Sequence, residues 1–103
     1  MAPAFFLNTR KLKAGIARAA KALGRDVIRI DYDRGLDVMG NESIFFKIVL
    51  ADHASRQPKI REVAQRAALT LMNELQTDEN GVHAYFNFRS ESEVAQIHDP
   101  AWA

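Results

Sequence analysis

The chain has 103 residues, of which 48% are apolar and 26% charged, and its formal net charge is +1. These values are typical of one globular domain, they argue against disorder, and they show no overall charge imbalance that would point to nucleic acid or membrane. The absence of cysteine excludes disulfides, thiolate nucleophiles and cysteine-ligated zinc. The start, MAPAFFLN, lacks a signal-peptide pattern, and no apolar run approaches the roughly 20 residues of a membrane span, so we expect a cytoplasmic protein. We expect a single domain over residues 1–103, with loose ends at 1–8 and 98–103.

Charge is distributed unevenly along the chain. Residues 1–30 hold seven basic residues and one acid, whereas residues 31–54 hold two basic and five acidic residues. Residues 55–76 are again basic, with four against two, and residues 77–103 are acidic, with one against five. The folded molecule is therefore expected to be electrically polarised.

Residues 8–24 (NTRKLKAGIARAAKALG) read as an amphipathic helix. Asn8 or Thr9 suits the N-cap, and Gly24 suits the left-handed stop. At about 100° per residue the basic side chains gather on the exposed face. The expected buried stripe is Leu12, Ile16, Ala19, Ala20 and Leu23.

Two alternating segments follow, and they predict half-buried strands over residues 26–33 and 43–52. In the first, the core side is expected to hold Ile28, Ile30 and Tyr32, with Val27 pointing outward. In the second, the core side is expected to hold Ile44, Phe46, Ile48 and Leu50. Gly35, Gly40 and Asn41 favour a loop between the strands. We expect Val38 and Met39 to pack beneath a helix end, and the alternative is that the loop tip contacts a partner.

A second helix is predicted from Pro58 to Gln76. Its expected buried stripe is Ile60, Val63, Ala64, Ala67, Ala68, Leu71 and Leu75, and Leu69 is expected near the exposed back. Asn80-Gly81 signals a turn into a third strand over residues 81–90, with Val82, Ala84, Phe86 and Phe88 inward. Ser90 and Glu93 form a capping-box pattern, which indicates a short helix to about Ile97.

The resulting order is α-β-β-α-β with a short C-terminal helix. Each long helix has one apolar face, which it can bury only against the same side of a sheet. The sequence therefore predicts an α+β two-layer sandwich, in which two helices cover one face of a three-stranded mixed sheet. Either the first or the second strand could be central. The other sheet face is left open unless a partner or the termini cover it.

The stretch DYDRGLDVMGNE places Asp31, Asp33, Asp37 and Glu42 at positions one, three, seven and twelve of a calcium-type loop. The position that requires glycine holds Leu36, however, and the flanking segments are strands rather than helices. We therefore interpret the stretch as a solvated hairpin loop, and we predict no metal and no cofactor.

Catalytic patterns are weak. Asp52-His53 is the one adjacent acid–histidine pair, but neighbours at a strand end usually point apart, and Ser55 is better explained as a helix cap. His83 and His98 have no histidine at metal-ligand spacing. Arg56, Lys59 and Arg61 surround the start of the second helix, where an anion could bind, but we favour the interpretation that these side chains extend into solvent. We therefore predict no enzymatic activity.

The open sheet face is expected to show Arg29, Phe45, Lys47, Val49, His83, Tyr85, Asn87 and Arg89. Three occupants remain possible: a protein partner or second copy, a nucleic acid, or the chain's own Phe5, Phe6, Leu7 or Trp102 folding back. The element order is similar to that of small RNA-binding modules such as type II K-homology domains. Their Gly-x-x-Gly loop is absent, and HAYFNFRS lacks the glycine of an RNA-recognition signature, so no family is assigned.

The sequence thus favours a non-enzymatic interaction module that docks to a protein or to itself. The predicted contact residues are Phe45, Val49, Tyr85, Leu69, Phe5 and Phe6. The alternative is an RNA- or DNA-binding module in which bases stack on Phe45 and Tyr85. Its predicted phosphate contacts are Lys11, Arg18, Lys21, Arg56, Lys59 and Arg61.

Overall fold

Strand β2 (Glu42–Leu50) forms the centre of a three-stranded sheet in the computed structural model, which describes residues 8–102. It pairs antiparallel with β1 (Val27–Leu36) and parallel with β3 (His83–Ser90). The helices are α1 (Thr9–Leu23), α2 (Lys59–Leu75) and α3 (Glu91–Ile97). The predicted α+β fold and mixed sheet are confirmed, and the strand order left open by the sequence has β2 in the middle.

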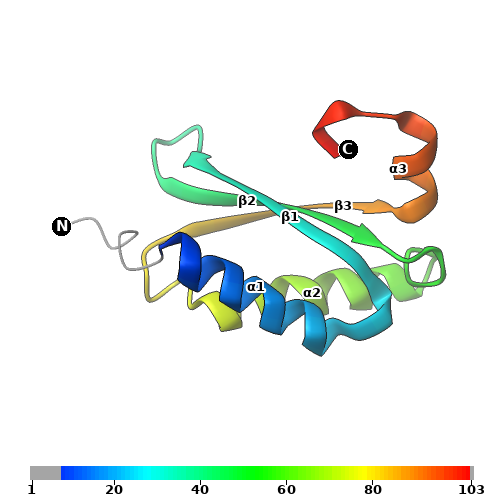
Figure 1. Ribbon diagram of the computed structural model, residues 1–103, viewed down its shortest axis with the longest axis horizontal. Coiled ribbons are helices and arrows are strands. Elements are labelled where there is room, and N and C mark those ends of the chain that lie inside the picture. Colours follow the sequence, from blue (N-terminus) through cyan, green and yellow to red (C-terminus); the bar gives the residue numbers. More distant parts are fainter. Residues whose placement is uncertain (1–7, 103) are drawn as a thin grey trace.

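Helices α1 and α2 lie side by side against one face of the sheet (Figure 1). The core lies between the helix layer and the sheet. Residues of the central strand β2 dominate it, because each inward side chain of β2 has a neighbouring strand on both sides. Its fully buried members include Leu12 of α1, Ile44, Phe46 and Ile48 of β2, and Val63 and Leu71 of α2. Inward residues of the edge strands, such as Tyr32 and Phe86, are only partly buried.

Helix α1 begins and ends at the predicted residues. The Asn8 side chain accepts a hydrogen bond from the Lys11 amide at 2.9 Å, and Gly24 has a φ of 66° after the last turn. The predicted inward position of Ala20 is wrong, because Ala20 is exposed and Gly15 is buried in the stripe instead. Gly15 faces Leu75, so it marks the close approach of α1 and α2.

A β-bulge changes the start of β1. The register shifts between Val27, which lies opposite Leu50, and Arg29, which lies opposite Val49, so Ile28 is an extra residue. The inward prediction for Ile28 is therefore wrong: Ile28 is 51% exposed, and Val27 packs against the core in its place. Alternation alone does not reveal a bulge, because the pattern of apolar residues continues through it.

The C-terminal segment lies over the other face of the sheet (Figure 1). The Ser90 hydroxyl accepts from the Glu93 amide, and the Glu93 carboxylate accepts from the Ser90 amide, so the predicted capping box starts α3. The expectation of a loose end at 98–103 is wrong for residues 98–102, because Trp102 is buried. Residues 1–7 and 103 lie outside the described part of the chain. Within residues 8–102 no helix is long and apolar enough to cross a membrane.

Candidate docking surface

The sheet face opposite α1 and α2 is a grid of three strands whose residues align in rows. From the hairpin end, the rows across β1, β2 and β3 are Gly35–Ser43–His83, Asp33–Phe45–Tyr85, Asp31–Lys47–Asn87 and Arg29–Val49–Arg89. All eight residues predicted for this face belong to the grid. The last row differs from the rows of Phe45 and Lys47 because the C-terminal segment covers it.

The last row lies beneath the C-terminal segment. Arg29 donates a hydrogen bond to the Trp102 carbonyl, and the Arg89 guanidinium lies 5.0 Å from the centre of the Trp102 ring. Val49 is consequently only 4% exposed, so the prediction that it is an accessible contact residue is wrong. The alternative in which Trp102 folds back holds for this row alone. We call the rows of Phe45 and Lys47, which it leaves uncovered, the open half.

The open half is centred on two stacked rings. Phe45 of β2 and Tyr85 of β3 are paired in register, with ring centroids 5.3 Å apart and planes 14° apart. Tyr85 is 42% exposed and Phe45 is partly exposed. A shallow groove runs here, lined by Phe45, Phe46, Lys47, Tyr85, Phe86 and Asn87.

One wall of this surface is the loop between β1 and β2, which rises on the side away from α1 and α2 (Figure 1). The Asp37 carboxylate accepts from the Tyr85 hydroxyl at 2.7 Å and from the amides of Met39 and Asn41 at 2.9 Å. These bonds, the Tyr85 bond foremost, lower the pKa of Asp37 to about 2, and the same contact raises the pKa of Tyr85.

The loop tip is exposed, contrary to prediction. Met39 is 80% exposed and Val38 is fully exposed, so neither packs beneath a helix end. The reason is the network around Asp37, which folds the loop toward Tyr85 rather than toward the helices. Two apolar side chains therefore stand in solvent at the edge of the open half.

The acidic residues of this face interact with basic side chains or with backbone amides. Lys47 lies 2.9 Å from Asp33, and Arg29 lies 2.8 Å from Asp31. In residues 8–102 no group of three potential ligands gathers to hold a metal ion. Since Asp33 and Asp31 are balanced, Asp37 adds a net negative charge beside the aromatic pair.

The remaining predicted contact residues are elsewhere. Leu69 is exposed, as predicted, but it lies on α2, in the helix layer on the other side of the sheet. Phe5 and Phe6 fall outside the described residues. Of the six predicted contact residues, the structure therefore brings only Phe45 and Tyr85 together on the open half. Val38 and Met39, which we expected beneath a helix end, lie exposed beside them.

The predicted phosphate contacts lie in the helix layer and at its end. Lys11, Lys21 and Arg61 are exposed there, whereas Arg18 pairs with Glu74 at 2.8 Å and Lys59 lies 3.8 Å from Asp26. Phe45 and Tyr85, the residues expected to stack bases, are on the opposite sheet face. A single strand of nucleic acid would have to pass around the sheet to reach both sets.

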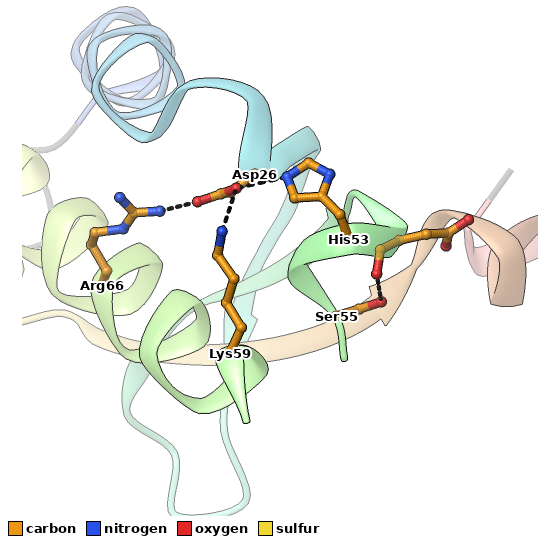
Figure 2. Close-up of polar contacts among 6 residues, drawn as sticks. Asp26, His53, Ser55, Lys59 and Arg66 are labelled. Atoms are coloured by element: carbon orange, nitrogen blue, oxygen red, sulfur yellow. Dashed lines mark hydrogen bonds and ion pairs between the residues drawn. The ribbon is translucent and has the colours of Figure 1, made fainter. Parts of the chain in front are cut away.

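Asp26 is the centre of a polar cluster that includes His53, one of the weak catalytic candidates of the sequence (Figure 2). Its carboxylate lies 2.9 Å from His53 Nε2 and also contacts Lys59 and Arg66. The His53 bond is the largest cause of a lowered pKa at Asp26, with Arg66 and Lys59 adding to it. The cluster joins the end of α1 to α2, which is a structural role.

His53 and Asp52 point to different partners, as expected. The Asp52 carboxylate accepts from the Ser92 amide at 3.0 Å, whereas His53 binds Asp26. Ser55 donates to the Asp52 carbonyl at 3.0 Å and does not cap α2, so the cap interpretation of Ser55 is wrong. No acid, base and nucleophile converge in this part of the described chain.

Comparison with protein-family models and with curated proteins finds no match to this chain. The geometry of the open half is therefore the basis on which we infer a function.

Proposed function

We propose that this domain is a non-enzymatic interaction module that docks to a protein partner through the open half of its sheet. The observation that carries the proposal is the stacked Phe45–Tyr85 pair, exposed beside a groove and flanked by the apolar loop tip. Apolar patches of this kind, bordered by polar residues, are typical of protein-binding surfaces.

The surface favours a particular kind of ligand. Asp37 is ionised at neutral pH and lies at the groove's edge, so a basic residue in the ligand would be attracted. Aromatic rings and the exposed Met39 suit a short apolar segment, since methionine adapts to varied shapes. The proposed ligand is thus a protein segment with an apolar side chain next to a lysine or arginine.

Two features support a binding role over catalysis and over nucleic acid. The polar groups around Asp26 and Asp52, which include the catalytic candidate His53, are used in contacts between elements of the fold. The open half carries a net negative charge, which would repel phosphate. We also propose a cytoplasmic location, which the cysteine-free composition supports.

A displayed peptide library selected on the folded domain tests the proposal. The selected peptides are expected to combine an apolar residue with an adjacent basic residue, and they should not bind the Phe45→Asp variant. Leu69→Asp is the matched control, because it makes the same kind of change on the helix layer, and it should bind as the wild type does. Peptides that lack the basic residue, or that bind Phe45→Asp equally well, would reject the proposed surface.

The nucleic-acid alternative has its own test. Exposed Lys11 and Lys21 on α1 make that layer basic, so the protein would be retained on mixed-sequence RNA in a salt-dependent way. Our proposal predicts weak retention that Lys11→Glu with Lys21→Glu removes without changing peptide binding. Tight RNA binding that also requires Phe45 and Tyr85 would favour the alternative instead.

A further inference from the structure

The two edges of the sheet differ in how well they are protected from pairing with another strand. β1 carries a bulge at Ile28 and charged residues along its length, which are the usual devices that blunt an edge. β3 has no proline, no lysine and no bulge in its register with β2. Within residues 8–102 no strand pairs with its outer side.

The inward residues of β3 are also incompletely covered. Phe86 and Phe88 pack against the core but stay partly exposed. Their rings are stacked, with centroids 6.4 Å apart. Beside them, α2 presents Ala64, Ala68 and Met72, which are partly exposed as well. Met72 shares a groove with the start of β3, and spacings of four residues place Ala64 and Ala68 along the same side of the helix.

The ends of this side of the molecule carry opposite charges. Arg61 lies eleven residues before Met72, which is about three helical turns, so it projects from the same side near the N-terminal end of α2. Asp78 lines the groove at the other end, where the chain turns into β3. α2 runs antiparallel to β3, because it connects the parallel strands β2 and β3. Arg61 is therefore level with the end of β3, and Asp78 is level with its start.

We propose that β3 pairs antiparallel with β3 of a second copy about a twofold axis near Phe86, which gives a continuous six-stranded sheet. A twofold axis places the end of one β3 beside the start of the other, so Arg61 of each copy approaches Asp78 of its partner. The same axis brings together the partly exposed Phe86 and Phe88 side chains of both copies. The small side chains of Ala64 and Ala68 let the two α2 helices approach closely.

The dimer would not occupy the open half, because Phe45 and Tyr85 point out of the sheet face rather than along its edge. Both copies would instead present their open halves on the same side of one sheet. Dimerisation through β3 is therefore independent of ligand binding at the open half, and each proposal can be rejected without the other.

Sedimentation equilibrium over a wide concentration range tests the dimer. Arg61→Glu and Asp78→Arg should each weaken association by about three- to tenfold, as expected for an exposed ion pair that occurs twice, and the double variant should restore it. Ala68→Glu should abolish the dimer. Arg10→Glu, which makes the same charge change on α1, and Phe45→Asp should leave it unchanged. Amide exchange of β3 should slow as the protein concentration rises.

A chain that is monomeric at every concentration would overturn the proposal. A dimer that tolerates Arg61→Glu and Ala68→Glu but is broken by Phe45→Asp would also overturn it, since association would then occur through the open half. All of these substitutions except Ala68→Glu and Phe45→Asp change exposed residues only, so the charge-swap comparison holds even if Ala68→Glu unfolds.

Discussion

The Tyr85 hydroxyl donates a hydrogen bond to the Asp37 carboxylate at 2.7 Å, although their strands are not neighbours. Asp37 follows β1, Tyr85 lies on β3, and β2 separates the two strands. The bond therefore bends the hairpin loop across the sheet. It gives the open half a wall and fixes the orientation of the Tyr85 ring against Phe45.

Replacing this hydroxyl should change the titration of Asp37. In Tyr85→Phe the largest cause of the lowered pKa is lost, so the pKa of Asp37 should rise from about 2 toward its ordinary 3.8. Because the folded pKa is depressed, the carboxylate stabilises the loop fully above about 3.8, and this contribution is lost as the pH falls through about 2.

Nuclear magnetic resonance of the Asp37 carboxyl carbon measures this shift directly. Tyr32→Phe serves as the control, because Tyr32 lies on the helix side of the sheet and should leave Asp37 unchanged. An Asp37 that titrates alike in both variants would show that the Tyr85 bond is absent in solution.

Trp102→Ala should uncover the last row of the sheet face. Trp102 is buried against Arg29 and Arg89, so its removal should lower the free energy of unfolding by about 2–3 kcal/mol and expose these two side chains. Urea unfolding measures the loss. Ile97→Ala removes an exposed side chain from the same segment and should cost no more than about 0.5 kcal/mol. Equal effects of the two substitutions would mean that the C-terminal segment does not pack on the sheet.

Gly15→Val should separate α1 from α2. A Cβ atom at Gly15 would lie 2.4 Å from Leu75 Cδ2, and the Glu74 carbonyl lies close behind at 3.5 Å. Since Leu75 is itself buried, it has little room to move, and we expect a loss of about 1–3 kcal/mol in thermal or urea unfolding. Ala14→Val, on the exposed face of the same helix, should cost only about 0.5 kcal/mol in helix propensity. A Gly15→Val protein as stable as Ala14→Val would contradict this contact.

Asp26→Asn should weaken the junction between the end of α1 and α2. The substitution removes the negative charge that faces His53 and Arg66, and because these partners are about half exposed we expect a loss of only about 1 kcal/mol at neutral pH. The folded pKa of Asp26 is lowered, so the wild-type advantage should persist above the ordinary aspartate pKa and shrink as the pH falls through the folded value.

Unfolding of wild type and Asp26→Asn at several pH values checks this dependence. Glu79→Gln removes one negative charge at an exposed position and should change stability little at any pH. A difference that stays constant down to strongly acidic pH would show that the Asp26 charge is not involved.

The sequence predicted most of the fold because its patterns are local. Asn8, Gly24 and the Ser90–Glu93 box define helix ends, and the alternation around Phe46 defines the central strand. The errors have non-local causes. Ile28 is displaced by a bulge that depends on pairing with β2, and Val49 is buried beneath the C-terminal segment, which is more than forty positions away.

The candidate surface was predicted only in part for the same reason. Strand alternation placed Phe45 and Tyr85 on the same face, but the wall formed by Asp37 depends on a bond to Tyr85 that no spacing rule describes. The role of Asp26 was also missed, because its hydrogen-bond partners His53 and Arg66 lie 27 and 40 positions away in the sequence. The one local signal of a covered end was the tryptophan in DPAWA, a residue type that is usually well buried.

The most direct test of the central claim is to map the amide signals of the isotope-labelled domain as a selected peptide is added. We predict that the shifts occur at Phe45, Lys47, Tyr85 and Asn87 and in the loop at Asp37–Asn41, and that Phe45→Asp abolishes them. Shifts confined to α1 and the start of α2, with the open half unchanged, would contradict this prediction.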